Sequence, residues 1–178
     1  KEEFLTVTID APLEWQPRLR QLDGQSRESF YEQRQALKFL CEKVDKYFNM
    51  EADFKKHTIL HGPPGCGKTF LGLLQVLYAI SKGLFSTVTS IPSKRARECG
   101  GTHIAQLILL RGHQNDKISS NPQLLADDII KRLFSNPLHL NVLRVLSLLL
   151  LEEGGLFSSE LLAAINSTVG YIRHNPDY

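Results

Sequence analysis

The sequence predicts an α/β fold in which a parallel sheet is flanked by helices. A short β-branched run at residues 57–60 leads through a Gly-Pro loop into an apolar stretch, residues 68–81, that has helical character. Two further strand-like runs follow at residues 84–90 and 145–151. Strands that alternate with helices along a chain are typical of parallel sheets covered by helices.

Length and composition indicate one well-buried globular domain. The chain has 178 residues, of which 42% are hydrophobic and 22% charged, and its formal net charge of +2 does not by itself indicate a nucleic-acid partner. Cys41, Cys66 and Cys99 are odd in number and too widely spaced for a zinc knuckle, so we interpret them as reduced intracellular thiols.

The opening of the chain does not read as a signal peptide. The opening "KEEFLTVTID" lacks the apolar core of a signal peptide. The longest apolar run, "VLSLLLL", is far shorter than the ~20 residues that a membrane helix needs, so we expect no membrane association. Because an initiator Met is missing and the chain ends in "RHNPDY", we expect a piece of a longer protein.

Residues 1–27 are predicted to form a weakly structured leader, punctuated by Pro12, Pro17 and Gly24. A helix is expected from Glu28, because apolar residues recur on one of its faces. The helix at residues 68–81 is apolar nearly all round, which predicts that it is mostly buried against the sheet. The expected inner face of the first helix consists of Leu37, Leu40, Cys41, Val44 and Phe48.

The second half of the chain is expected to hold an insertion and then the central strand. Residues 111–140 read as an insertion without recognisable chemistry, and residues 145–151 as a buried third strand at the centre of the sheet. One helix of the insertion is expected to pack on the domain through Leu124, Leu125, Asp128, Ile129 and Leu133.

The sequence "GPPGCGKT" at residues 62–69 matches the phosphate-binding pattern G-x-x-x-x-G-K-[ST]. Its glycines allow successive N–H groups to face phosphate oxygens, and the helix behind it directs a positive N-terminus at the same anion. Lys68 is expected to reach the β and γ phosphates and to act in catalysis, and Thr69 to bind Mg²⁺. The alternative is a Gly/Pro turn that merely precedes a helix. The expected nucleotide contacts are Gly62, Pro63, Pro64, Gly65, Cys66, Gly67, Lys68, Thr69 and Phe70.

Cys66 allows two interpretations. A thiol near a helix N-terminus can be reactive, but we prefer a tolerated filler at a variable loop position. In either case ATP is expected to protect this thiol from a maleimide.

An acidic pair follows the run of four leucines at the predicted third strand. Glu152 is expected to hold Mg²⁺ through water, and Glu153 to orient the attacking water as a catalytic residue. Ligands of open α/β sheets bind at the carboxyl ends of strands, where this pair would lie. The alternative is that both carboxylates simply cap a surface turn.

A basic patch follows the second predicted strand. Lys94, Arg95 and Arg97, with Ser90 and Ser93 beside them, suit the backbone phosphates of a single nucleic-acid strand. The alternative is a solvated basic face of a helix.

Taken in order, these segments resemble the first motor domain of superfamily-one DNA helicases, specifically the petite-integration-frequency helicases and the helicases of rolling-circle transposons. The resemblance is carried by "YEQRQAL", "GPPGCGKT", "VTSIPSKRARECGGTHIAQLI" and "LLLLEEGGLFSSELLAAINSTVGYIRHN". It implies that Gln33 contacts the adenine and that His103 adds to the DNA contacts. The family's Asp-Glu pair is Glu152-Glu153 here, and its Ile-Ser-Met is Gly154-Gly155-Leu156.

The resemblance implies a RecA-like domain over residues 28–178 that binds ATP and Mg²⁺ and stops after the acidic-pair helix. In the parent, ATP hydrolysis would drive 5′-to-3′ movement on single-stranded DNA, in DNA repair and recombination, in the nucleus or mitochondrion of a eukaryote. The second RecA-like domain, with its arginine finger, would be the missing partner. We therefore expect a monomer that binds ATP but hydrolyses it negligibly.

Three other classes remain open from the residues alone. The loop wording also resembles ring-forming ATPases associated with diverse activities, although Thr69 and Glu152 are separated by 83 positions (152 − 69), which is long for those modules. A P-loop kinase would need an arginine-rich lid, and we find none in the sequence. A decayed, non-catalytic helicase fragment that only binds nucleotide is the third.

Overall fold

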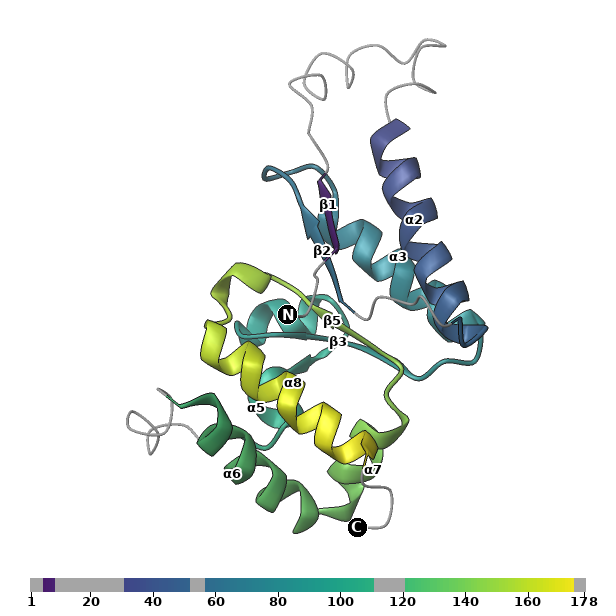
Figure 1. Cartoon of the computed structure of the whole chain (residues 1–178). Helices are drawn as coiled ribbons and strands as arrows, with labels where there is room; N and C mark the ends of the chain where they lie inside the picture. The colour runs from purple at the N-terminus through teal and green to yellow at the C-terminus, as the bar shows by residue number, and fades with distance from the viewer. Residues whose placement is uncertain (1–4, 9–30, 52–56, 111–120, 175–178) are drawn as a thin grey trace. The chain divides into compact units, whose positions relative to one another are not determined.

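The computed structural model describes residues 5–8, 31–51, 57–110 and 121–174. The chain divides into two compact units, Lys1–Leu84 and Phe85–Tyr178, and each contains parallel strands together with helices (Figure 1). The predicted α/β class with a helix-flanked parallel sheet is therefore confirmed. The expected motor domain over residues 28–178 includes parts of both units and stays a prediction.

The first unit pairs two strands and packs two helices against each other. Strand β1 pairs with β2 in parallel register, Leu5 opposite Thr58. Because β1 lies inside the predicted leader, the expectation of weak structure is wrong for those four residues. The described elements of this unit are β1 (Leu5–Thr8), α2 (Tyr31–Phe48), β2 (Thr58–His61) and α3 (Lys68–Ser81).

Helix α2 confirms the predicted amphipathic helix, with differences at its ends. Its described part begins at Tyr31, and the predicted start at Glu28 lies outside the described residues. Phe48, expected on the inner face, is 50% exposed, because it is the last residue of the helix. The buried side chains recur at helical spacing and are Gln33, Ala36, Leu40 and Val44.

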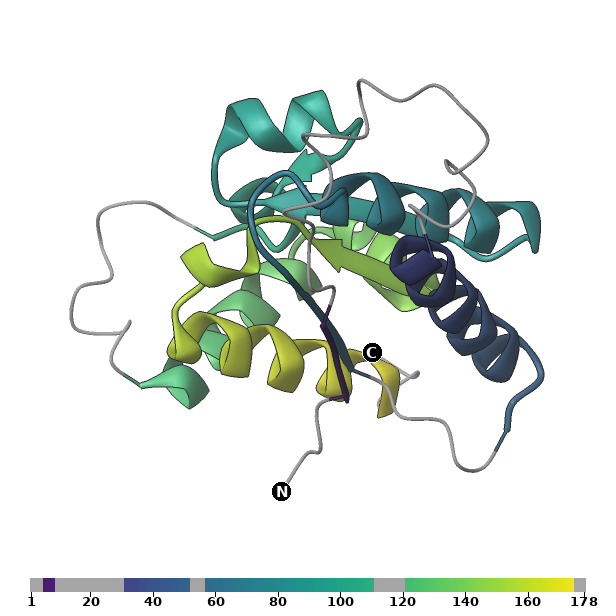
Figure 2. The ribbon, with the colours of Figure 1, turned by 90° about the horizontal axis from the view of Figure 1, so that it is seen from above.

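Helix α3 has the predicted bounds, but it is not buried all round. It packs beside α2, where the Gln75 amide donates a hydrogen bond of 3.3 Å to the Leu40 carbonyl (Figure 2). One face therefore supplies the contact, whereas Phe70, Leu77 and Ile80 are 64%, 60% and 51% exposed. The prediction that α3 is mostly buried therefore holds for one face only, since apolar composition alone does not show which faces find a partner.

A polar cluster ties the end of α3 to α2. The Tyr78 hydroxyl donates to Asp45 at 2.9 Å, and the Lys82 ammonium lies 3.0 Å from the same carboxylate. The hydrogen bond from Lys82, together with the one from Tyr78, holds the pKa of Asp45 below its ordinary value. The carboxylate form is thus favoured in the folded state.

Asp45→Asn is expected to lower the melting temperature at neutral pH by about 2 °C, because the ion pair is partly exposed. A carboxyl whose folded pKa is depressed stabilises above its unfolded pKa and loses that contribution as pH falls through the folded value. The difference in melting temperature between wild type and variant should thus be equal at pH 7 and pH 6 and shrink below about pH 4. Thermal melts by circular dichroism measure it, and a gap independent of pH would contradict this role.

The second unit holds a parallel sheet of three described strands in the order β4–β3–β5. The register places Thr89 opposite Thr102 and Ser86 opposite Leu148. Strand β3 thus lies at the centre of this sheet, so the prediction that the leucine-rich strand is central is wrong for these three strands. The strands are β3 (Ser86–Ser90), β4 (Thr102–His103) and β5 (Leu148–Leu151).

The predicted third strand begins three residues later than expected. Val145 is the last residue of helix α7, and Leu146 takes the extended conformation that ends this helix. The branched and apolar sequence before β5 therefore continues a helix that Asn136 caps at its start. A run of apolar residues cannot by itself distinguish the end of a helix from the start of a strand.

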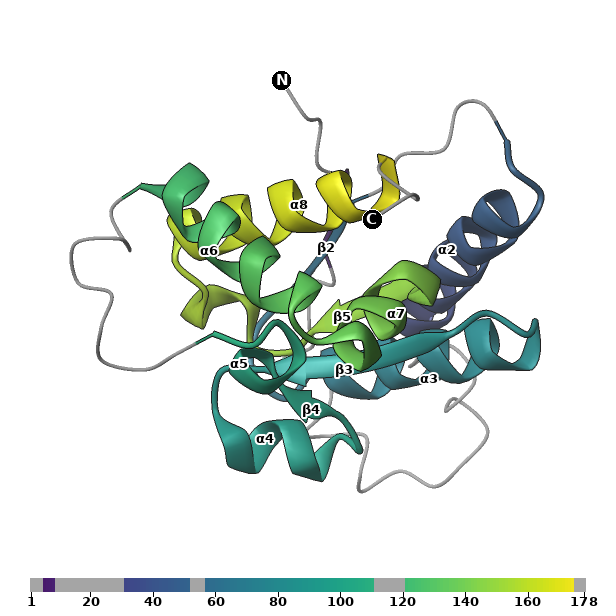
Figure 3. The same cartoon turned by 90° about the horizontal axis from the view of Figure 1, so that it is seen from below.

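Helices of the second unit pack around a shared apolar core, and α6 and α8 lie side by side (Figures 1 and 3). The expected insertion forms α6 and the first turn of α7, while its residues 111–120 lie outside the described part of the chain. Leu124 is 52% exposed and not on the inner face as predicted. None of the helices in the described ranges is long and apolar enough to cross a membrane. The helices are α4 (Ser93–Glu98), α5 (Ile104–Leu107), α6 (Pro122–Phe134), α7 (Pro137–Val145) and α8 (Ser159–His174).

Candidate functional site

The loop between β2 and α3 has the backbone of an anion-binding turn. Gly65 and Gly67 adopt left-handed conformations, with φ of 80° and 85°, directly before α3. A Cβ added to either glycine would meet no atom within 4 Å, so conformation and not crowding calls for glycine. Among the described residues, the N–H groups of Gly65, Gly67 and Lys68 have no hydrogen-bond acceptor. Successive free donors at a helix N-terminus form a concave site for an anion.

Lys68 brings a positive charge to the same loop. Its ammonium donates to the Gly62 carbonyl at 2.6 Å and to the Pro63 carbonyl at 2.7 Å, and it lies 3.6 Å from the Cys66 sulfur. The cation is therefore held over the loop, which is the residue type and position that recognition of phosphate needs. The residues present fit a nucleoside triphosphate.

Cys66 belongs to the core and not to the ligand face. Its side chain is 1% exposed and packs with Ala36, Leu40 and Leu71. The thiol thus packs the loop against α2 and α3, and its interpretation as a tolerated filler at a variable position stays a prediction. A maleimide cannot report ATP binding there, since the thiol is covered by protein atoms.

The remaining predicted nucleotide contacts differ in exposure. Pro63, Pro64 and Phe70 are exposed, and Thr69 is half-buried. Gln33 is 9% exposed on the inner face of α2, and its contact with adenine stays a prediction.

The acidic pair lies at the end of β5, where two hydrogen bonds fix it to β3. The Glu152 N–H donates to the Thr89 carbonyl at 2.8 Å, and the Ser90 hydroxyl donates to the Glu152 carbonyl at 3.1 Å. Ser90 is 0% exposed, so the expected nucleic-acid contact at Ser90 gives way to a structural role. Glu153 is left-handed, with φ of 55°, a conformation that costs a non-glycine residue energy and is often found at functional sites.

Arg95 joins the acidic pair to helix α4. Its guanidinium lies 3.0 Å from Glu152 and 3.8 Å from Glu153, and it also reaches Glu98 at 3.4 Å. The hydrogen bond to Glu152 raises the pKa of Arg95. A residue expected to contact DNA is thus in direct contact with the expected Mg²⁺ ligand. The sequence alone did not predict this pairing, because the two residues are 57 positions apart.

The other residues of the basic patch lie at the surface of α4 and in the next turn. Ser93 and Arg97 are exposed, and the Lys94 side chain is 86% exposed, 3.9 Å from Glu98. His103 caps α5, because its Nδ1 accepts a hydrogen bond from the Ala105 N–H at 3.1 Å. Its contact with DNA stays a prediction.

The predicted Mg²⁺ ligands belong to different units, Thr69 to the first and Glu152 to the second. In the described parts of the chain, no cluster of three or more His, Cys, Asp or Glu side chains could hold a metal by itself. A hydroxyl and a carboxylate are both ligands that Mg²⁺ accepts, so each residue by itself has a suitable side chain.

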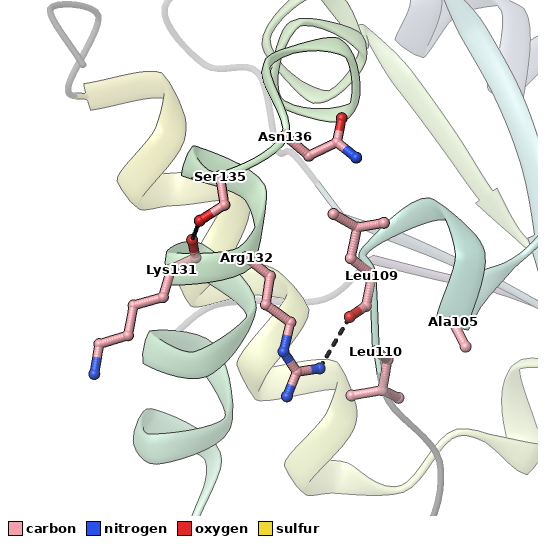
Figure 4. Close-up of a pocket in the computed structure, with 7 residues that line it drawn as sticks. All are labelled: Ala105, Leu109, Leu110, Lys131, Arg132, Ser135 and Asn136. Atoms are coloured by element: carbon pink, nitrogen blue, oxygen red, sulfur yellow. Dashed lines mark hydrogen bonds between the residues drawn. The ribbon is translucent and has the colours of Figure 1, made fainter.

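A separate hollow of about 580 Å³ lies in the second unit between the end of α5 and the end of α6 (Figure 4). Arg132 points across it and donates to the Leu109 carbonyl at 3.0 Å, and it also pairs with Asp128. The guanidinium is thereby committed to structure, and none of the predicted site residues lines the hollow. Its walls are Ala105, Leu109, Leu110, Lys131, Arg132, Ser135 and Asn136.

Comparison of this chain with protein-family models, with curated proteins and with solved structures found no match. The helicase resemblance therefore rests on the order of the motifs. The glycine conformations and the position of Lys68 are observed independently of it.

Proposed function

We propose that this chain binds ATP and Mg²⁺ through residues 62–69 and serves as the RecA-like motor domain of an ATP-dependent DNA helicase that moves 5′ to 3′ on single-stranded DNA. One observation supports the proposed nucleotide binding. Left-handed Gly65 and Gly67 and the free N–H groups around them form a concave set of donors at the start of α3, with the Lys68 ammonium held over the same loop. A triphosphate is the biological anion that such a loop accommodates.

The roles proposed for the other residues are those that the motifs and the helicase resemblance imply. By the motifs and the resemblance, Lys68 would stabilise the β and γ phosphates, Thr69 would bind Mg²⁺ beside them, Glu152 would hold Mg²⁺ through water, and Glu153 would orient the attacking water. Mg²⁺ supplies neutralisation of the charge that develops on the transferred phosphoryl group. Gln33 contributes the adenine contact that the resemblance implies.

The nucleic-acid part is supported by two neighbouring strand ends. Strands β3 and β5 are parallel and adjacent, so their carboxyl ends lie at one edge of the sheet. Helix α4 follows β3 and exposes Lys94 and Arg97, and the acidic pair follows β5. This edge is where ligands of open α/β sheets bind, and the exposed cations there suit DNA phosphates.

Gly67→Ala and Gly83→Ala form a matched pair that tests the loop. Both glycines are left-handed, with φ of 85° and 79°, and a Cβ at either would meet nothing within 4 Å. Each variant should therefore lose roughly 1 kcal/mol of unfolding free energy through strain alone. Only Gly67→Ala should also weaken binding of a fluorescent ATP analogue, by about tenfold or more, because only Gly67 belongs to the loop.

Equal affinity of both variants for the analogue would contradict the proposed nucleotide site. DNA-stimulated ATP hydrolysis by a longer chain that includes a second motor domain would support the helicase over a nucleotide-binding remnant. Hexamers that appear with nucleotide in light scattering would instead favour a ring-forming ATPase.

A further inference from the structure

We propose that Arg95 is a positioning residue that couples nucleic acid on α4 to divalent-cation binding at Glu152 and Glu153. In the described arrangement its guanidinium holds these carboxylates, and a DNA phosphate that binds Arg95 releases them to the cation. This inference rests on the proposed function, because it assigns the regulation of the same acidic pair.

Arg95 lies in an acidic environment. Three carboxylates surround its guanidinium, those of Glu152 at 3.0 Å, Glu98 at 3.4 Å and Glu153 at 3.8 Å. The Glu152 side chain is 12% exposed, so this contact is better shielded from water than the other ion pairs of α4. Shielding strengthens an ion pair, and a divalent cation must displace the guanidinium to use the bonded oxygen.

The backbone around Glu152 and the helix that carries Arg95 have little freedom to move apart. Glu152 is fixed to β3 through the Thr89 carbonyl and the Ser90 hydroxyl. Helix α4 is anchored by Ala96, which is 0% exposed and whose carbonyl accepts from the Gly101 N–H at 2.8 Å. Release of the carboxylates therefore requires the Arg95 side chain to turn away, and not the elements to separate.

A phosphate of a nucleic-acid strand bound to α4 would draw Arg95 away from the carboxylates. Lys94 and Arg97, on either side of it in sequence, are exposed and suited to a phosphodiester backbone. Guanidinium groups bind phosphate in the same bidentate manner as carboxylate, so a strand held by α4 offers Arg95 an alternative partner. Binding of nucleic acid would then strengthen binding of the cation, and binding of the cation would strengthen binding of nucleic acid, without direct contact between them.

The experiment uses the intact chain, Mn²⁺ alone as the probe, and electron paramagnetic resonance to count free Mn²⁺. Arg95→Ala is expected to bind Mn²⁺ about tenfold more tightly than wild type, in the usual range for such coupling. Adding Glu152→Gln to Arg95→Ala should abolish this gain. Lys131→Ala removes an exposed cation of the same unit and should leave Mn²⁺ affinity at the wild-type value.

A single-stranded oligothymidine should tighten Mn²⁺ binding in wild type and not in Arg95→Ala. Linkage requires Mn²⁺ to tighten oligothymidine binding by the same factor, which fluorescence anisotropy measures. Because this reciprocal test needs only wild type, an absence of coupling overturns the inference even if Arg95→Ala fails to fold. Unchanged Mn²⁺ affinity in a folded Arg95→Ala, or no coupling in wild type, would overturn the inference. Coupling without any ATP binding would overturn the proposed ATPase function alone.

Discussion

Gly101→Ala should produce the largest loss of stability of any substitution considered for this chain. A Cβ at Gly101 would lie 2.1 Å from the Val88 carbonyl oxygen and 2.7 Å from its carbon. Backbone atoms of the central strand β3 cannot move aside as the tip of a side chain can. The variant must therefore push β4 away from β3 and disturb the hydrogen bond of 2.6 Å from Thr89 Oγ1 to the Thr102 carbonyl.

We expect Gly101→Ala to cost on the order of 3 kcal/mol of unfolding free energy, as overpacking against a rigid neighbour does. Urea denaturation followed by circular dichroism measures it. Gly155→Ala is the matched control, because a Cβ there meets nothing within 4 Å and its φ is not positive, so its stability should stay within about 0.5 kcal/mol of wild type. Equal stability of the two variants would mean that β3 and β4 do not approach as closely as described.

Lys68→Ala should produce the largest loss of nucleotide affinity. The Lys68 ammonium is the cation held over the loop, and charge-assisted hydrogen bonds to phosphate contribute about 1.5–3 kcal/mol. The dissociation constant for a fluorescent ATP analogue should therefore rise roughly 10- to 100-fold. Titration by fluorescence measures it, with circular dichroism to show that the variant is folded.

Lys38→Ala provides the control for Lys68→Ala. Lys38 lies in the same unit on α2, its side chain is 71% exposed, and its partner Glu42 is on the same helix. Removal of this cation changes the net charge equally and should leave ATP affinity unchanged. A Lys68→Ala variant that binds ATP as tightly as Lys38→Ala would contradict the assignment of the loop as a nucleotide-binding site.

Local patterns predicted the elements of this fold well. The bounds of α3 agree with the sequence because the phosphate-loop motif places Lys68 at the start of its helix. The strand predicted at residues 57–60 is displaced by one residue, and that at residues 84–90 is shortened to β3. Such shifts at element ends are expected, because hydrophobic pattern fixes an element better than its boundaries.

Features that depend on distant contacts were not predictable from the residues alone. The burial of Cys66 follows from its packing against Ala36 and Leu40, 30 and 26 positions away. The pairing of Arg95 with Glu152 requires β3 and β5 to be neighbours, which no local pattern states. The sequence therefore identified the residue types of the candidate site, and the structure shows which of them are in contact.

In the function proposed for this chain, the N–H groups of the loop bind the phosphates of ATP. Backbone amide NMR of the ¹⁵N-labelled chain tests it most directly, with ATP and Mg²⁺ added in one titration and adenosine in another. The Gly65, Gly67 and Lys68 amides should shift with ATP and stay in place with adenosine, while the Gly83 amide should move with neither. Loop amides that ATP leaves unmoved would contradict it.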